Sequence, residues 1–486
     1  SYGGGGSGGS VFLQGRTLKG VNGIISANGG SHTSATGGGS GGGGGRVAVV
    51  YDPAAQGAQS LIARPQIVFS ANQGLVSNNE NASPDRTGIT SWGRPGTLYF
   101  PDQQLFPQPL TGGGVIEIPG ATAFLLKSLT VSNGYLVFPA GASLIVSNDL
   151  NIIGQGGGIE LTNGLLEVGG SLRVNGFATG ARYPRLRLWA DNNNASSITV
   201  GGDLHLTNRA SLWIHSGCTN GLAPDYGVLV TVHGNAFISQ GSWIYPHAQP
   251  TNGGAPLFRF KNCWIGPNAG FNADGLGFGG KIADGTTTNR GYGPGGGWYS
   301  AYAYGGGAGH GGYGGGTAVL AGVLCGGLYG SSNTPPFYPG SNGGPGSPSG
   351  GQGGWGGGLI RLEVTETLDF NGLMSANGGS STFAGVARGP SYYGGGGSGG
   401  GIYVQCRSFT STGGTIRANG GPSGPSGKAG GGGRIAVFRH SGELPGVITW
   451  QANSGGTGGQ SGWSNPENGT IHWGFLPPRG TLFIIR

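Results

Sequence analysis

The middle of the chain alternates apolar and polar residues in short segments that recur at a fixed spacing. Val168, Val200 and Val232 lie 32 residues apart. Further apolar residues follow each valine four and six positions later, namely Leu172, Leu204 and Ala236, then Val174, Leu206 and Ile238. An earlier member of the series has Val146, Leu150 and Ile152. Alternation with a period of two predicts β-strands with one buried face.

A second apolar segment follows each of these strands, at residues 186–188, 212–214 and 243–245. Strand pairs repeated at a fixed spacing are typical of a parallel β-helix, in which every coil adds one strand to each sheet. A β-sandwich would explain the alternation but not the repeated register of 32 residues. The pattern therefore predicts an all-β protein, with a right-handed parallel β-helix (β-solenoid) in its middle part.

The two ends of the chain carry related sequence. An offset of 391 residues aligns Gly3 with Gly394, and the apolar positions of VFLQ near the start then match those of IYVQ near the end. The matches continue through ISANGG and IRANGG, GGGGRVAVV and GGGGRIAVF, and GTLYF and GTIHW. A third, partial copy runs through LIRLEV and LMSANGGS. Each copy predicts strands separated by glycine segments.

The recurring Ala-Asn-Gly-Gly tetrads predict sharp turns after these strands, because asparagine and glycine accept positive φ. The glycine runs themselves allow two interpretations, polyglycine II-like helices that pack closely or flexible loops. Collagen is excluded because the strict Gly-X-Y period is missing.

Glycine supplies 116 of the 486 residues, which alone would suggest disorder. Hydrophobic residues nevertheless make up 36% of the chain and fall in strand-like segments, which a disordered chain lacks. We therefore predict three ordered regions: a glycine-rich β module at 1–110, whose copy lies at 391–477, a parallel β-helix at 111–290, and a second glycine-rich β module at 291–486.

The charge distribution argues against nucleic acid as a partner. The net charge is +7, but the 25 basic residues are spread thinly, without the concentrated basic stripe that nucleic acid requires. No apolar run reaches the length of a membrane span. A secretion signal is also missing, so the sequence reads as a mature or trimmed product.

The four cysteines match no CxxC metal-binding pattern. In a glycine-rich β protein they favour an extracellular location, where disulfides persist. We expect Cys218 to pair with Cys263 and Cys325 to pair with Cys406, although four buried thiols are the alternative. Three asparagines stand in sequons that a suitable host would glycosylate: Asn81, Asn194 and Asn468.

The strings ISANGG, GGGGGRVAVVY and NGTIHWGF resemble the glycine-rich parallel β-helix repeats of large bacterial secreted and cell-surface proteins. The resemblance covers residues 1–100 and about 340–475. It implies a solenoid fold and an extracellular or cell-surface location, and it implies no particular catalytic residues.

Candidate catalytic groups are few. A glycosidase needs two carboxylates about 5–10 Å apart, and the acids on neighbouring strands are Glu160, Glu167, Asp191 and Asp203. Scattered acids on outward strand positions are usually solvated. The histidines of the middle region are expected at the surface rather than in a metal site: His205, His215, His233 and His247. We therefore predict no enzyme activity, no catalytic residues, no cofactor and no metal.

The stretch RYPRLRLWAD is the best candidate for a binding face. Arg185, Arg187 and Trp189 share one face of a predicted strand, and Trp213, Trp243 and Tyr245 are expected on nearby strands. Flat aromatic and guanidinium groups on such a face suit sugars. Alternatively, the tryptophans cover the core.

The sequence favours an extracellular structural protein. A solenoid has two open ends, and here both ends carry related sequence, so we expect copies of this chain to assemble head to tail into a filament or a surface layer. The alternative is a carbohydrate-binding or polysaccharide-degrading β-helix protein, that is, a lyase, a glycosidase or an adhesin.

Overall fold

The protein is all-β, with long parallel sheets and one short helix among the residues described. The computed structural model describes residues 4–31, 41–58, 66–74, 93–105, 112–154, 156–176, 183–191, 196–221, 225–280, 290–298, 305–316, 325–331, 335–346, 352–381, 394–423, 427–441, 446–456 and 464–476. The chain forms two compact units. The first comprises Ser1–Trp189 with Ile198–Leu212, and the second comprises Ala190–Ser197 with Trp213–Arg486. The predicted three-part division stays a prediction.

The first unit contains three parallel rows of strands and one separate pair. One row runs β1 (Ser10–Gln14), β3 (Arg46–Val50), β5 (Thr97–Tyr99), β6 (Gly114–Glu117), β9 (Tyr135–Val137), β12 (Gly158–Thr162), β15 (Arg185–Trp189). The second runs β7 (Ala123–Leu126), β10 (Ser143–Val146), β13 (Leu165–Val168), β16 (Ser197–Val200), and the third β8 (Leu129–Ser132), β11 (Leu150–Ile153), β14 (Leu172–Asn175), β17 (Leu204–Thr207). The pair consists of β2 (Val21–Ser26) and β4 (Gln66–Ser70), and the helix α1 spans Pro53–Gly57.

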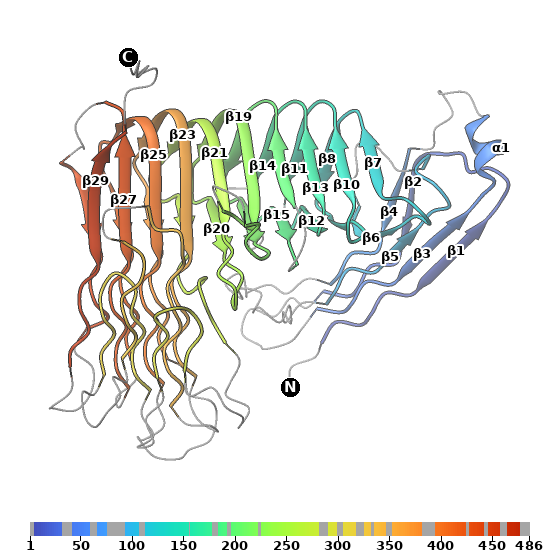
Figure 1. Ribbon diagram of the computed structural model, residues 1–486. Helices are drawn as coiled ribbons and strands as arrows, with labels where there is room; N and C mark the ends of the chain where they lie inside the picture. The colour runs from blue at the N-terminus through green and yellow to red at the C-terminus, as the bar shows by residue number, and fades with distance from the viewer. Residues whose placement is uncertain are drawn as a thin grey trace. The chain divides into compact units, whose positions relative to one another are not determined.

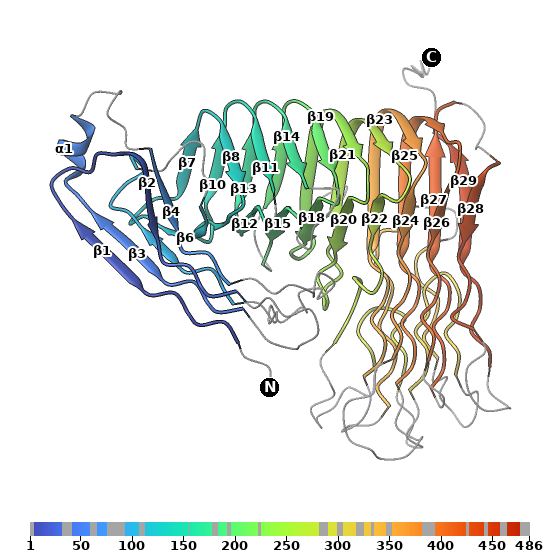
Figure 2. The ribbon, with the colours of Figure 1, turned by 180° about the vertical axis from the view of Figure 1, so that it is seen from behind.

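The second unit contains two parallel rows (Figures 1 and 2). One row runs β18 (Ser211–His215, mostly in this unit), β20 (Trp243–His247), β22 (Gly270–Asn272), β24 (Leu373–Ser375), β26 (Gly414–Arg417), β28 (Ile448–Gln451). The other runs β19 (Val228–Ile238), β21 (Pro256–Ile265), β23 (Leu359–Phe370), β25 (Gly401–Thr410), β27 (Arg434–Arg439), β29 (Thr470–Phe475).

The 32-residue spacing seen in the sequence is a strand register in the structure. In the first unit Leu172 pairs with Leu204, and Arg173 and Val174 continue the same register. The leucines and valines of these strands are buried, whereas Arg173 between them is half-buried. Apolar residues thus stack on apolar residues from strand to strand, which fixes the register because a slip by one residue would expose them.

The terminal repeats also share one register. Ser10 of β1 pairs with Arg46 of β3, and their counterparts Gly401 of β25 and Arg434 of β27 pair in the same way. The next strand again matches, because β3 pairs with β5 as β27 pairs with β29. The sequence repeat is therefore a structural repeat.

The tetrads do not make the turns that we expected. Among the residues with positive φ, neither Asn28 nor Asn377 nor Asn419 is found. Their side-chain oxygens instead accept hydrogen bonds from the backbone of the next repeat: Asn377 Oδ1 from Asn419 N–H and Asn419 Oδ1 from Asn453 N–H, both at 2.8 Å. The asparagine is thus a link between neighbouring repeats.

The glycine segments of the second unit are buried and bonded to one another. Figure 1 shows them continuing side by side beyond β23, β25, β27 and β29. Gly354 N–H donates to the Gly395 carbonyl and Gly395 N–H donates to the Gly344 carbonyl, both at 2.8 Å. A Cβ added to Gly395 would lie 1.9 Å from the carbonyl oxygen of Gly306, so only glycine fits. These contacts fit closely packed segments and not flexible loops, and the polyglycine II form of the segments stays a prediction.

Among the described residues, no helix has the length and apolar character needed to cross a membrane.

Candidate functional site

The predicted sugar-binding residues fall in both units. Arg185, Arg187 and Trp189 lie on β15 of the first unit. Trp213 lies on β18, and Trp243 and Tyr245 lie on β20, in the second unit. Arg185 and Arg187 contact Tyr135 and Glu160 in a first cluster, and Trp213 contacts Tyr245 in a second cluster.

A glycine allows the first cluster to form. Gly158 of β12 pairs with Tyr135 of β9 on one side and with Arg185 of β15 on the other. A Cβ on Gly158 would lie 2.4 Å from the Tyr135 ring, so the absence of a side chain lets that ring lie across the strand. The Arg185 guanidinium then stacks over the ring, 4.7 Å from its centroid.

A carboxylate completes the cluster. Glu160 accepts a 2.6 Å hydrogen bond from the Tyr135 hydroxyl, and it forms an ion pair with Arg187 at 3.3 Å. The Arg187 guanidinium in turn lies 5.5 Å from the Trp189 ring. Burial raises the pKa of Tyr135 to about 12, and burial is also the main cause that lowers the pKa of Arg185. Two guanidinium groups face one carboxylate, which leaves one positive charge in excess.

The second cluster is a pair of ring stacks. Trp213 and Tyr245 lie with centroids 4.0 Å apart and planes 16° apart, and His215 and His247 stack at 4.0 Å and 26°. Trp243 is half-buried beside Gly270 of β22. Trp213 and Tyr245 each give one face to the other ring, so that face is not available to a sugar.

Our expectation of surface histidines is wrong for two of the four. His215 and His247 are 8% and 3% exposed. They are 32 residues apart, which is the spacing of the apolar positions, so they occupy equivalent places on successive strands. His233 is exposed and His205 is half-buried, with its Nε2 4.0 Å from Asp203.

The four candidate acids lie on or near different strands of the fold. Glu160 is bound to Tyr135 and Arg187, whereas Glu167 is exposed on β13, which belongs to another row of strands. Asp191 lies in the second unit and Asp203 beside His205. Within the part of the chain that the structure describes, no three His, Cys, Asp or Glu residues are grouped so that they could hold a metal ion.

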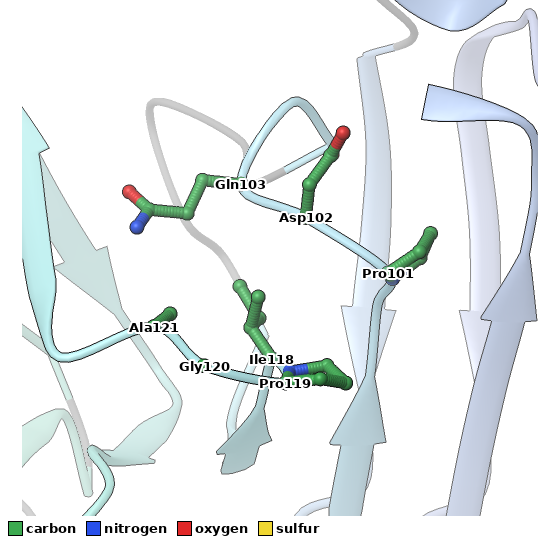
Figure 3. Close-up of a pocket in the computed structure, with 7 residues that line it drawn as sticks. All are labelled: Pro101, Asp102, Gln103, Ile118, Pro119, Gly120 and Ala121. Carbon is green, nitrogen blue, oxygen red and sulfur yellow. The ribbon is translucent and has the colours of Figure 1, made fainter. Parts of the chain in front are cut away.

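A small pocket in the first unit has one acid at its wall. Figure 3 shows its lining residues: Pro101, Asp102, Gln103, Ile118, Pro119, Gly120 and Ala121. The Asp102 carboxylate already accepts hydrogen bonds from the Tyr51 hydroxyl and the Gln104 side chain. Gln103 donates to the Ala123 carbonyl of β7 at 2.6 Å, so these side chains stabilise the loop.

The expected disulfides are not formed. All four cysteines lie in the described part of the chain, and none is disulfide-bonded. Cys263 and Cys406 are buried within strands, where Cys263 pairs with Ala236 and Leu368, and Cys406 pairs with Val364 and Arg439. The residues paired with them in strand register are therefore not cysteines. Cys218 and Cys325 are half-buried.

Two of the three sequons, those of Asn81 and Asn194, lie outside the described residues. Asn468 is exposed, and its side-chain oxygen accepts a 2.8 Å hydrogen bond from Ser454 N–H.

The open edges of the sheets carry exposed apolar side chains. In the first unit β1 and β2 are edge strands, with Phe12 64% and Ile24 73% exposed. In the second unit β29 is an edge strand, with Trp473 50% and Phe475 67% exposed. Figure 2 shows β1 and β29 at the edges of their units. Sequence reasoning pointed to both ends of the chain but not to these side chains.

No protein-family model, no curated protein and no solved structure matches this chain. The chain nevertheless contains its own comparison, because the same repeat occurs once at an open edge and once in a covered position.

Proposed function

We propose that this protein is an extracellular structural protein that assembles head to tail into a filament or a surface layer. Its parallel sheets are those of a right-handed β-solenoid, and its assembly surfaces are the open edges at β1 with β2 and at β29.

The observation that carries the proposal is the different exposure of one repeat position at an edge strand and at an inner strand. Phe12 of β1 corresponds to Tyr403 of β25 in the aligned repeats. Tyr403 is 7% exposed and its strand is flanked by β23 and β27, whereas β1 pairs with β3 alone among the described strands. The internal copy thus indicates what belongs on the open edge, namely another strand of the same kind.

Physical chemistry supports this assignment. An unprotected edge strand presents unpaired backbone groups that template further pairing, and contiguous exposed apolar groups mark interaction sites. A contact between two different edges of the same chain is heterologous, so it propagates from copy to copy instead of closing into a dimer.

The test is a concentration series of the purified chain, followed by sedimentation velocity and negative-stain electron microscopy. We expect uniform fibres or sheets above a threshold concentration. Phe12→Lys should raise that threshold, and Ile153→Lys is the matched control because Ile153 is outward-facing on β11, which is paired on both sides. Single particles at every concentration would refute self-assembly.

The cluster around Arg185 favours a second function, binding of an acidic polysaccharide. Its guanidinium groups lie against aromatic rings and outnumber the carboxylate. Titration with polygalacturonate should show binding that Arg185→Gln weakens, whereas a neutral polysaccharide should bind no better to the wild type than to the variant. Equal binding of both polymers would exclude this role.

A further inference from the structure

One glycine position recurs before the strands of the terminal repeats and sets how closely they stack. It is the glycine immediately before the first residue of the strand, and we call it the stacking glycine. A Cβ added to Gly400 would lie 2.0 Å from the carbonyl oxygen of Gly358, the residue before the preceding strand. The same relation holds throughout both repeats: Gly433 to Gly400 at 2.1 Å, Gly469 to Gly433 at 1.9 Å, Gly45 to Gly9 at 1.9 Å and Gly96 to Gly45 at 1.9 Å.

The carbonyl that faces each stacking glycine also accepts a hydrogen bond. The donor is the N–H of the residue after the stacking glycine. The bonds are Gly401 to Gly358 at 3.1 Å, Arg434 to Gly400 at 2.9 Å, Thr470 to Gly433 at 3.0 Å, Arg46 to Gly9 at 2.9 Å and Thr97 to Gly45 at 3.0 Å. The same carbonyl thus makes both the close approach and the hydrogen bond, and this pair of contacts repeats from strand to strand.

The series is incomplete at the edge of each unit. In the first unit, a Cβ on Gly9 would meet nothing within 4 Å, so Gly9 has no carbonyl before it in the described part of the chain. In the second unit, Gly469 precedes the edge strand β29, and no described strand follows it. Gly96, its counterpart in the first unit, has its carbonyl hydrogen-bonded to Val115 N–H at 2.7 Å. Within the described residues, therefore, Ser10 N–H has no such acceptor and the Gly469 carbonyl has no such donor.

We propose that the two incomplete ends complete each other between copies of this chain. The Gly469 carbonyl of one copy packs against the Cα of Gly9 in the next copy and accepts a hydrogen bond from Ser10 N–H. β29 then lies parallel to β1 and takes the place that β23 has beside β25. This inference rests on the proposed self-assembly and specifies its register.

The residues before Gly469 do not obstruct this contact. They include Pro466 and Asn468 instead of glycine. In the internal copy the non-glycine Trp355 stands at the matching place, and its carbonyl oxygen lies 2.0 Å from where a Cβ on Gly397 would be. Gly6 corresponds to Gly397 and, like Gly9, has nothing within 4 Å of an added Cβ. The receiving strand needs glycine, whereas the strand that docks on it does not.

The decisive variant is Gly9→Ala. Its methyl group meets open space in the single chain, and the φ of Gly9 is not positive, so the fold and its thermal stability should not change. In the assembly the same methyl would lie about 2 Å from the docked carbonyl, far inside contact distance. We expect the concentration for half-assembly to rise by about tenfold or more. Gly413→Ala is the matched control, because its methyl also meets nothing within 4 Å and it lies between the inner strands β25 and β26.

A second variant tests the hydrogen bond. Ser10→Pro removes the N–H that the docked carbonyl would accept from and should weaken assembly in the same way. Assembly of wild type and Gly413→Ala with loss in Gly9→Ala supports the register. Assembly of Gly9→Ala at the wild-type threshold overturns the register and leaves the proposed function standing. Failure of the wild type to assemble overturns both.

Discussion

Acid should weaken the glycine-rich part of the second unit through a single histidine, His310. Its side chain is 1% exposed, its Nδ1 lies 2.9 Å from the Gly399 carbonyl, and its ring stacks on Tyr329 at 4.4 Å. A carbonyl only accepts, so Nδ1 carries the proton of the neutral ring. Burial, the largest cause, and the nearby positive charge of Arg434 lower the pKa of His310 from 6.5 to about 3.

The magnitude follows from linkage. Between pH 6.5 and 3 the unfolded chain binds the His310 proton and the folded chain does not, so the free energy of unfolding decreases as the pH falls through this window. The slope is about 1.4 kcal/mol per pH unit. At pH 6.5 only half of the unfolded chains carry this proton, so the loss from this residue between pH 6.5 and pH 4.5 is about 2 kcal/mol.

The variant His310→Asn keeps a donor for the Gly399 carbonyl and cannot titrate. At pH 8 it should be less stable than wild type by about 1–3 kcal/mol, because the ring packing is lost. Urea unfolding at pH 8.0, 6.5, 5.5 and 4.5 measures both proteins, and the difference should shrink or reverse by pH 4.5. His233→Asn, at an exposed position, controls for the substitution itself. A difference that stays constant across this range would refute the reasoning.

Two further variants and one thiol assay test the repeat, the cluster and the cysteines. Asn419→Ala removes hydrogen bonds to Asn453 N–H and to Gln451, and it should lower the free energy of unfolding by about 1–3 kcal/mol in urea titrations, whereas no loss would deny the asparagine link. Gly158→Val should displace the Tyr135 ring and break its hydrogen bond to Glu160. The Tyr135 phenol should then titrate near pH 10, its ordinary value, instead of near 12. Ellman's reagent without reductant should count four thiols after unfolding and react slowly in the native state, because burial raises the pKa of Cys406 to about 12; fewer than four would indicate a disulfide.

The sequence predicted the strands well wherever side chains alternate. The register of Leu172 with Leu204 follows directly from their spacing, because burying one face of a strand leaves few alternatives. The terminal repeats were equally visible, since Val11 and Ile402 occupy matching places in matching strands. These features depend on apolar pattern alone.

Contacts between polar residues were less predictable. Tyr135, Gly158 and Arg185 meet on three adjacent strands, but the loops between them differ in length, so no fixed spacing connects them. His215 and His247 do have the fixed spacing, and they were missed because histidine was counted as a surface residue. The disulfides failed for a related reason, since spacing along the chain does not determine which strand neighbours a cysteine has.

The glycine segments explain why the glycine content, taken alone, wrongly suggested disorder. Ordering glycine costs more backbone entropy than ordering any other residue, so a glycine run is disordered unless many contacts offset that cost. Here Gly395 donates to Gly344 and accepts from Gly354, and Ser398 donates to Ser341 and accepts from Gly357. Each segment is thus hydrogen-bonded to more than one neighbouring segment, and removing one segment would expose the backbone of the segment beside it. Such an array is most stable when its last member is covered, which is the physical reason to expect a partner at Gly6 and Gly9.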